Sequence, residues 1–263
     1  MNSVEFLSED VEVSMSDYWD DIARADHFWM DWRFHVIARV LRSFISREKS
    51  ASSPRILDIG CGAGVVREQL EGTFNVSVDG CDLRREVLEN GYQGRGRRFV
   101  YDIFQEREDM VGKYDGVMLL DVIEHLDDDV KFLMSATRHV RKEGWVLITV
   151  PALPLFFGPY DIALGHKRRY TDSTLRNLLR VCQICNSSVG YWGLGMIPLL
   201  AARTLLQRKT DTFSIVKSGF EPPSSFVNQL LKISGIIERA TLKNPLVGAS
   251  LFAVGRVSEQ TSI

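Results

Sequence analysis

One regular alternation, over residues 55–151, constrains this chain more than any other feature of its sequence. Short segments rich in β-branched and aromatic residues, such as RILDIG, GVMLL and WVLITV, alternate with helical segments such as VVREQLEG and DDDVKFLMSATRHV. Strands and helices that alternate at this pace form βαβ units, in which the strands pair in parallel. Because the strands are almost continuously apolar, we expect helices on both faces of the sheet. The sequence therefore predicts a doubly wound α/β fold.

The segments outside this alternation complete one expected domain, residues 1–263. Its parts are an N-terminal helical cap (1–50), the alternating core (54–152), a region of loops with a helical insertion (153–248) and the last strand (249–257). Hydrophobic periodicity predicts helices over residues 18–45, 172–182 and 197–207 and after Pro223, and a strand near residues 188–192.

The composition is that of an ordinary globular protein. Of 263 residues, 45% are hydrophobic and 25% charged, and the net charge is −2. This balance excludes a disordered or fibrous chain and gives no overall positive field for nucleic acid or an anionic membrane.

The acidic start, MNSVEFLSEDVEVS, lacks the basic and apolar regions of a signal peptide. The longest uncharged run, residues 181–202, is broken by polar residues and Pro198. We therefore expect a cytoplasmic protein without a transmembrane helix.

The four cysteines are too few for a disulfide scaffold in a chain of this size. Cys182 and Cys185 have the CxxC spacing of half a zinc site or of a redox pair. No second CxxC accompanies them in the sequence. We therefore interpret the pair as structural thiols at the end of a helix.

The motif ILDIGCGAG, residues 56–64, places three glycines where the first core strand ends and a helix begins. Such a turn lets backbone N–H groups approach a ligand closely. The dinucleotide fingerprint is G-x-G-x-x-G, whereas Gly60, Gly62 and Gly64 follow G-x-G-x-G and Val65 stands where the third glycine belongs. The motif alone is as typical of a tight turn as of a nucleotide site, and it fits NAD imperfectly.

Three aspartates accompany the glycines. Asp58 stands inside the first strand, where an unpaired carboxylate is costly, so we expect it to meet a donor or a cation. Asp82 and Asp102 close the next two strands, where they are suited to ribose hydroxyls and to an exocyclic amine of adenine. Each alone is also explained as a helix or turn cap. Together, at the carboxyl ends of successive strands, they indicate the ligand crevice of an open α/β sheet.

ILDIGCGAG, the strand end at Asp82, YDI at residues 101–103 and YDGVMLLDVIEHL at residues 114–126 together resemble the class I S-adenosylmethionine-dependent methyltransferases. More weakly, HFWMDWR, LGHKRRYT and NPLVGASLFAVGR are similar to a bacterial subgroup of that family that is linked with cell-surface glycan or natural-product biosynthesis. The resemblance implies a seven-stranded sheet of order 3-2-1-4-5-7-6, whose last strand, SLFAVGRV, is antiparallel.

The resemblance also implies that S-adenosylmethionine is the cofactor and S-adenosylhomocysteine the product. The glycines would lie against the adenosine and methionine portions, Asp58 would face the amino group, Asp82 would hold the ribose, and Asp102 with Ile103 would hold the adenine. Leu120 would flank the transferred methyl group. The full set of expected cofactor contacts is Asp58, Gly60, Cys61, Gly62, Gly64, Asp82, Leu83, Asp102, Ile103, Leu120 and, from the N-terminal cap, Arg33.

For the reaction itself, the sequence offers two histidines as general base, His125 and His166. His125 is equally explained as a partner of Glu124 or a helix cap. His166 precedes Lys167 and two arginines, whose charge favours a neutral imidazole; the alternative is that RRYT is only the polar start of the next helix. The expected substrate contacts, which would suit an anionic acceptor group, are Arg168, Arg169, Tyr170 and Asp161. Asp161 or Asp172 would orient His166.

The leading hypothesis is therefore methyl transfer to a hydroxyl of a small-molecule or glycan-intermediate acceptor, with nitrogen and carbon acceptors left open. The alternatives are an NAD-dependent oxidoreductase, disfavoured by Val65, and a non-catalytic cofactor-binding module. Nucleic-acid acceptors are disfavoured because LDVIEH replaces the Asn/Asp-Pro-Pro-aromatic motif. We expect no metal, although the short spacing of Asp121, Glu124 and His125 leaves an ion open.

One apolar segment with a basic end, residues 191–209, has three interpretations. It is suited to a lipid-linked acceptor or membrane surface, to a homodimer interface, or to the roof of a substrate pocket. We favour the pocket roof because the segment follows the sixth core strand.

Overall fold

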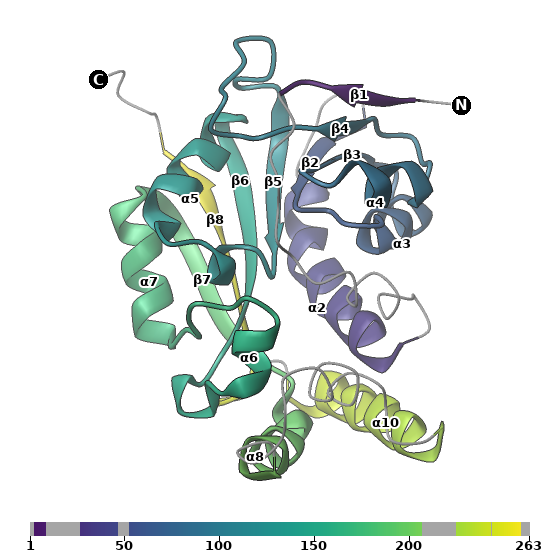
Figure 1. Ribbon diagram of the computed structural model, residues 1–263, viewed down its shortest axis with the longest axis vertical. Helices are drawn as coiled ribbons and strands as arrows, with labels where there is room; N and C mark the ends of the chain where they lie inside the picture. The colour runs from purple at the N-terminus through teal and green to yellow at the C-terminus, as the bar shows by residue number, and fades with distance from the viewer. Residues whose placement is uncertain (1–2, 9–26, 47–52, 207–224, 243, 259–263) are drawn as a thin grey trace.

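The structure is a computed structural model that describes residues 3–8, 27–46, 53–206, 225–242 and 244–258. Its centre is one twisted sheet with the strand order β1-β4-β3-β2-β5-β6-β8-β7 (Figure 1). The strands are β1 (Val4–Phe6), β2 (Arg55–Ile59), β3 (Ser77–Asp82), β4 (Arg98–Val100), β5 (Tyr114–Leu120), β6 (Val140–Pro151), β7 (Ile184–Trp192) and β8 (Ser250–Val257).

From β4 to β7 this order is the predicted 3-2-1-4-5-7-6. Strand β8 is antiparallel to both β6 and β7, whereas the other pairings are parallel. The sheet has one strand more than predicted, because β1 adds in parallel to the edge of β4. Three residues carry too short a pattern to reveal a strand, so its presence depends on the open edge that β4 offers.

The helices are α2 (Phe28–Ile45), α3 (Val65–Thr73), α4 (Arg85–Asn90), α5 (Asp129–Arg138), α6 (Pro159–Ala163), α7 (Asp172–Val181), α8 (Ile197–Leu206) and α10 (Ser225–Thr241). Three short 3-10 turns are η1 (Ile123–His125), η2 (Pro154–Phe156) and η3 (Leu194–Met196). The predicted helix over residues 18–45 is described from Phe28 onward, and residues 18–26 lie outside the described part.

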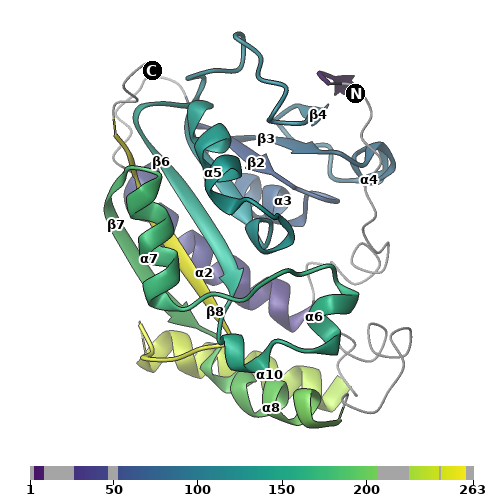
Figure 2. The same cartoon turned by 60° about the vertical axis from the view of Figure 1, so that its left-hand side comes forward.

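Two layers of helices cover the sheet, as the apolar strands predicted. Alternate strand residues point to opposite faces, so Leu57 packs with α5 and α7 while its neighbour Ile56 packs with α2 and α3. A third apolar cluster joins the first half of α2 to η3 and α8 through Trp32 and Trp192. Helices α8 and α10 lie together beyond one end of the sheet (Figures 1 and 2).

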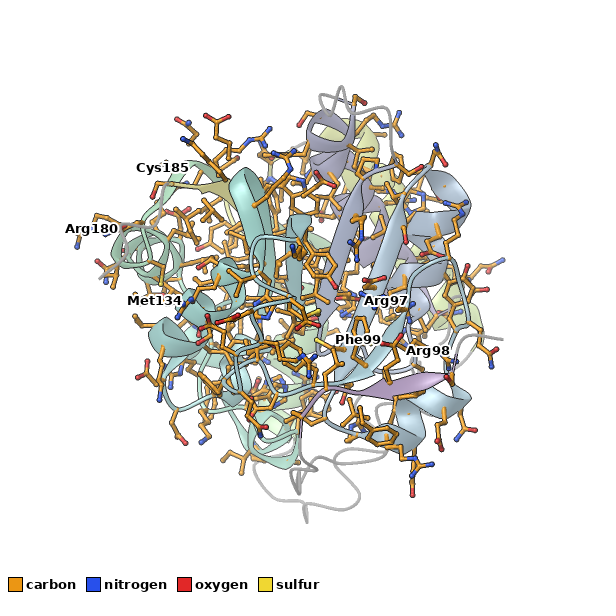
Figure 3. All side chains as sticks on the ribbon, turned by 90° about the horizontal axis from the view of Figure 1, so that it is seen from above. Arg97, Arg98, Phe99, Met134, Arg180 and Cys185 are labelled. Carbon is orange, nitrogen blue, oxygen red and sulfur yellow. The ribbon has the colours of Figure 1, made fainter. Side chains whose placement is uncertain are left out.

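All four cysteines are free thiols. Cys182 ends α7, and Cys185 is exposed on β7, at the outer rim of the molecule (Figure 3). No helix in the described ranges has both the length and the apolar character needed to cross a bilayer.

Candidate active site

The glycine motif forms the turn from β2 into α3. Gly60, Gly62 and Gly64 have φ angles of +73°, +52° and +78°, in the left-handed region that favours glycine. A Cβ on Gly60 would lie 2.8 Å from Val122 Cγ2, so the turn packs directly against the segment that follows β5. The bare backbone is therefore required both by the dihedral angles and by this close approach.

Asp82 holds the turn from the neighbouring strand. Its Oδ2 accepts a hydrogen bond from the Gly62 N–H at 3.0 Å, and its Oδ1 accepts one from the Arg84 N–H at 3.0 Å. The N-cap of α4 is Arg84, so Asp82 does not cap this helix. Cys61 is held to the same strand, since its N–H donates to the Cys81 carbonyl at 3.1 Å.

Asp58 is the buried carboxylate below this turn. It is only 2% exposed, and its Oδ1 has no hydrogen-bond partner among the described residues. Burial raises the pKa of Asp58 to about 7, against the opposing charges of Arg67 and Arg33. A buried acceptor without a partner fits the amino group of a bound ligand.

The remaining expected cofactor contacts line the same edge. Asp102 follows β4, and its Oδ1 accepts a hydrogen bond from the Phe104 N–H at 2.9 Å, as in an Asx turn. Ile103 is buried beside it, Leu83 follows Asp82 directly, and Leu120 is the last residue of β5. Asp58, the glycines, Asp82 and Asp102 thus come from three adjacent strand ends, which fits an adenosine ligand with an amino-acid tail.

Arg33 brings the N-terminal helix α2 to this edge. Its Nη1 donates to Asp121 Oδ2 at 2.8 Å, and the arginine is 5% exposed. Asp121 has a φ angle of +58°, unusual for a residue with a side chain, and its Oδ1 accepts a hydrogen bond from Thr149 Oγ1 at 3.2 Å. Sequence reasoning selected Arg33 but missed Asp121 as its partner.

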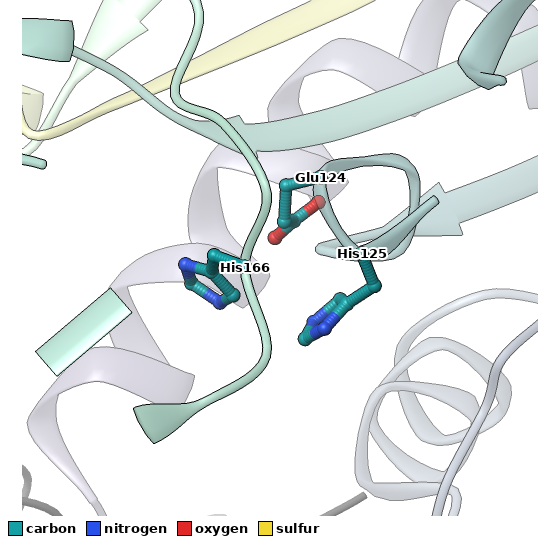
Figure 4. Close-up of side chains that lie close together, drawn as sticks. All are labelled: Glu124, His125 and His166. Atoms are coloured by element: carbon teal, nitrogen blue, oxygen red, sulfur yellow. The ribbon is translucent and has the colours of Figure 1, made fainter. Parts of the chain in front are cut away.

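Beyond Asp121, the side chains of Glu124, His125 and His166 converge (Figure 4). Their potential ligand atoms lie within 4.8 Å of one another. Glu124 is 0% exposed, and neither carboxylate oxygen has a hydrogen-bond partner among the described residues. Burial, followed by the charge of Asp121, raises the pKa of Glu124 well above its usual range.

The two imidazole rings stand almost at right angles, with centroids 4.8 Å apart and an interplanar angle of 86°. Burial, together with the neighbouring His166, lowers the pKa of His125 to about 4. His125 is therefore a neutral imidazole at neutral pH.

His166 is oriented by Asp161 of α6. Its Nδ1 lies 3.0 Å from Asp161 Oδ1, and the same oxygen accepts a hydrogen bond from Arg169 Nε at 2.8 Å. Burial opposes the ionised form of Asp161, but the hydrogen bond with His166 and the charge of Arg169 outweigh it and lower the pKa. Asp172, the other candidate partner, instead pairs with Arg176.

The basic residues after His166 also have partners within the protein. Arg169 is buried and donates to the Ala152 carbonyl as well as to Asp161. Arg168 lies 3.2 Å from Asp129 Oδ2, and the Tyr170 hydroxyl donates to the same oxygen at 2.7 Å. Asp129 was missed by sequence reasoning, since its only local signal is the run of aspartates that begins α5. Contact of Arg168, Arg169, Tyr170 or Asp161 with a substrate stays a prediction.

The sequence is similar to that of known methyltransferases. Residues 29–188 match a family model described as a methyltransferase domain. Ubiquinone biosynthesis O-methyltransferase of Burkholderia vietnamiensis is 27% identical over 136 residues, which are 47% of this chain and 57% of that protein. The corresponding enzyme of Chromobacterium violaceum is 27% identical over 144 residues, which are 49% of this chain and 60% of that protein. The chain thus matches less than two thirds of the length of these curated relatives.

Solved structures show the same fold at low sequence identity. A chain from the complex of the Haloferax volcanii Trm112 methyltransferase activator with a methyltransferase has a TM-score of 0.60 and 15% identity, covering 95% of this chain and 100% of its own. A second match is phosphoethanolamine N-methyltransferase 2 of Haemonchus contortus, solved with phosphomonomethylethanolamine and S-adenosylhomocysteine. Its TM-score is 0.55 and its identity 19%, and the match covers 95% of this chain and 61% of that chain.

The family match covers more than half of the chain, and the strand order, the glycine turn and the row of strand-end aspartates all agree with it. The fold is that of solved S-adenosylmethionine-dependent methyltransferases, and the chain belongs to the family described as a methyltransferase domain.

Proposed function

We propose that this enzyme methylates a hydroxyl oxygen of a small-molecule or glycan-intermediate acceptor. The observation that carries the proposal is the pair formed by His166 and Asp161, which stands beside His125 where the segment after β5 meets the loop after β6. A hydroxyl acceptor must lose a proton during transfer, and an imidazole held by a carboxylate is suited to accept it.

The cofactor side of the proposal uses the strand-end residues. The backbone of Gly60, Gly62 and Gly64 lies against the cofactor, Asp58 pairs with its amino group, and Asp82 accepts hydrogen bonds from the ribose. Asp102 and Ile103 hold the adenine, with Cys61 and Leu83 beside the turn, and Leu120 flanks the methyl group. When bound, S-adenosylmethionine supplies a methyl group on a positively charged sulfur.

On the acceptor side, His166 is the proposed general base. Because its Nδ1 hydrogen-bonds to Asp161, the proton lies on Nδ1 and Nε2 is left to take the hydroxyl proton. The acceptor oxygen forms a bond to the methyl carbon as the carbon–sulfur bond breaks, and the electron pair of that bond stays on sulfur. The charge of Asp161 stabilises the imidazolium ion that results. His125, which is neutral at neutral pH, is the second candidate base.

The link between the two sides is Arg33. Its charge acts on both Asp58 and Glu124, and its ion pair with Asp121 joins α2 to the end of β5. We propose that α2 thereby closes the site over the cofactor and excludes water from the in-line transfer.

An oxygen acceptor is supported by the names of the curated relatives, which are O-methyltransferases. For an anionic group on the acceptor, Arg168 is the better candidate because its side chain is 34% exposed, whereas the side chain of Arg169 is 4% exposed and holds Asp161. In this proposal Arg169 and Tyr170 position the site, and Arg168 contacts the acceptor.

The test is an acceptor screen with purified full-length protein and S-adenosylmethionine. Phenols, sugar alcohols and primary amines are compared by S-adenosylhomocysteine release and by mass of the product. His166→Ala should lower kcat on a hydroxyl acceptor by about 10²–10⁴-fold. His35→Ala, which removes an exposed histidine of α2, should leave it unchanged. Methylation of amines alone, or an unimpaired His166→Ala enzyme, would contradict the proposal.

A further inference from the structure

The carboxylate of Glu124 is buried, and the charges of Arg169 and Arg33 compensate it only in part. It is 0% exposed, and neither oxygen has a hydrogen-bond partner there. The two nearby arginines are already paired, since Arg33 binds Asp121 at 2.8 Å and Arg169 binds Asp161 at 2.8 Å. These two ion pairs are neutral, which leaves the charge of Glu124 in excess. A buried carboxylate in this position requires either a proton or a further cation.

The side chains around Glu124 are of residue types that commonly bind metal ions, and they lie close enough together to share one. His125 follows it in η1, and His166 reaches it from the loop after α6, so the three converge from two segments (Figure 4). The segments are fixed to each other, since the Lys167 N–H donates to the Glu124 carbonyl at 2.7 Å. Two imidazoles with one carboxylate are a common ligand set for Zn²⁺ and for other divalent transition metals.

The imidazole of His166 has a second partner that fixes the ring. His166 Nδ1 bonds to Asp161, which is itself held by Arg169 and by the Gly158 N–H at 3.1 Å. The ring of His125 lies beside Gly165, with Nδ1 3.7 Å from the position that a Cβ on Gly165 would take. A ligand histidine typically donates its other N–H to a carboxylate or a carbonyl, as His166 does, which directs the remaining nitrogen at the metal.

From this juxtaposition we propose that Glu124, His125 and His166 bind one divalent transition-metal ion, with Asp161 positioning His166. Bonds of about 2.0–2.2 Å place neighbouring ligand atoms roughly 3–3.5 Å apart, so the most widely separated ligand atoms approach each other by up to about 1.3–1.8 Å on binding. This contraction is compatible with the present spacing, in which the atoms lie within 4.8 Å. From the sequence we expected no metal, with an ion left open by the spacing of Asp121, Glu124 and His125.

The catalytic part of this inference rests on the proposed function. Three protein ligands leave coordination positions open, and an acceptor oxygen bound there has a lowered pKa. The hydroxyl then loses its proton to water before the site closes, so His166 is a ligand in the metal-loaded enzyme, and its role as general base applies to the metal-free enzyme. The binding part stands without any acceptor.

The experiment measures binding of the ion alone to the full-length protein, without cofactor or acceptor. Protein treated with chelator is titrated with Zn²⁺ by calorimetry and with Co²⁺ by visible absorption. We expect one ion per chain and a Co²⁺ band of the kind given by nitrogen and oxygen ligands. Glu124→Gln keeps the size of the side chain and removes its charge, and it should weaken Zn²⁺ binding by about 100-fold or more. Asp161→Asn should weaken it by about 10- to 100-fold.

Two variants serve as matched controls. His35→Ala removes an exposed histidine elsewhere, and Cys185→Ser removes the exposed thiol, so neither should change the affinity for Zn²⁺. Circular dichroism and thermal unfolding confirm that each variant is folded. The proposal is overturned if no saturable binding occurs, if Glu124→Gln and His166→Ala bind Zn²⁺ as the unaltered protein does, or if Cys185→Ser abolishes binding.

The outcomes for this site and for the proposed function are separable. Zn²⁺ binding that depends on Glu124, together with failure to methylate any hydroxyl, would contradict the proposed function and support the site. Hydroxyl methylation at an unchanged rate after removal of divalent ions, with no Zn²⁺ binding, would support the proposed function and overturn the site.

Discussion

Arg33 and Asp121 are 88 positions apart in the chain, and their side chains meet at 2.8 Å at the carboxyl edge of the sheet. The arginine comes from α2 and the aspartate from the end of β5, so this ion pair attaches the N-terminal helix to the row of strand ends that holds the site. The side chains are 6% and 21% exposed, which makes the pair much less screened than a surface ion pair.

Arg33→Met should therefore destabilise the protein by about 1–3 kcal/mol, because it leaves the Asp121 carboxylate without its charged donor. It should also weaken the binding of S-adenosylhomocysteine. Denaturant unfolding and calorimetry measure the two effects. In the double variant Arg33→Met/Asp121→Asn, the loss of stability should be smaller than the sum of the single losses.

The matched control is a second ion pair of α2, which joins this helix to α10. Asp31 pairs with Arg239 at 3.3 Å, and these side chains are 39% and 22% exposed. Arg239→Met should change stability by no more than about 1 kcal/mol. Equal losses of stability from Arg33→Met and Arg239→Met would show that burial does not strengthen the ion pair between Arg33 and Asp121.

Gly60→Ala should cost stability for two reasons, the positive φ angle and the contact of the new Cβ with Val122 at 2.8 Å. The substitution Gly112→Ala isolates the effect of the φ angle from that of the steric contact. The φ angle of Gly112 is +66°, and a Cβ there meets nothing within 4 Å. Gly112→Ala should cost about 1–2 kcal/mol from the backbone alone, and Gly60→Ala should cost about 1–3 kcal/mol more from overpacking. Chemical denaturation measures both.

If the contact with Val122 is the cause, Val122→Ala should recover part of the stability that Gly60→Ala loses. Gly112→Ala should leave the affinity for S-adenosylhomocysteine unchanged, and Gly60→Ala should lower it. An equal cost for the two glycines would refute the steric explanation.

The binding of S-adenosylhomocysteine should depend on pH through Asp58. The pKa of this carboxyl is raised to about 7 in the folded protein, so it holds a proton there over a range in which the unfolded chain has lost it. In the protein without ligand, this proton stabilises the folded state. The stabilisation is complete at low pH and is lost as the pH rises toward 7. The proposed pairing with an amino group needs the ionised carboxylate, so affinity should fall as the pH is lowered from 7.5 to 5.5, by up to about tenfold per unit.

Calorimetric titration at several pH values tests this dependence. Asp58→Asn should bind S-adenosylhomocysteine more weakly and with little change over the same pH range. Affinity of the unaltered protein that is constant from pH 5.5 to 7.5 would rule out Asp58 as the group that pairs with the amino group.

Asp82→Ala should weaken the binding of S-adenosylmethionine and S-adenosylhomocysteine by about 100-fold, because it removes both the proposed ribose acceptor and the hydrogen bond to the Gly62 N–H. Asp109→Ala, at a surface aspartate whose side chain is 64% exposed, is the control and should have no effect. NAD titrated in parallel should not bind. Tight NAD binding that survives Asp82→Ala would be incompatible with the roles assigned here.

Local patterns in the sequence were enough to predict a parallel α/β sheet and the glycine turn at its edge, because alternating apolar strands and helical periods are set by neighbouring residues. The order of the seven core strands and the antiparallel last strand at Ser250–Val257 were predicted from the resemblance to a known family. Asp161 and His166 are five positions apart, close enough for their pairing to be considered from the sequence.

Only the tertiary structure decided which charges are buried and which of them meet. The pairing of Arg33 with Asp121, the complete burial of Glu124 and the addition of β1 to β4 each join segments that no local pattern connects. Burial depends on what the rest of the chain packs around a side chain, and electrostatic energy depends on that burial. For this reason DVIEH in the sequence indicated a histidine base, and the folded chain showed a buried carboxylate facing two imidazoles.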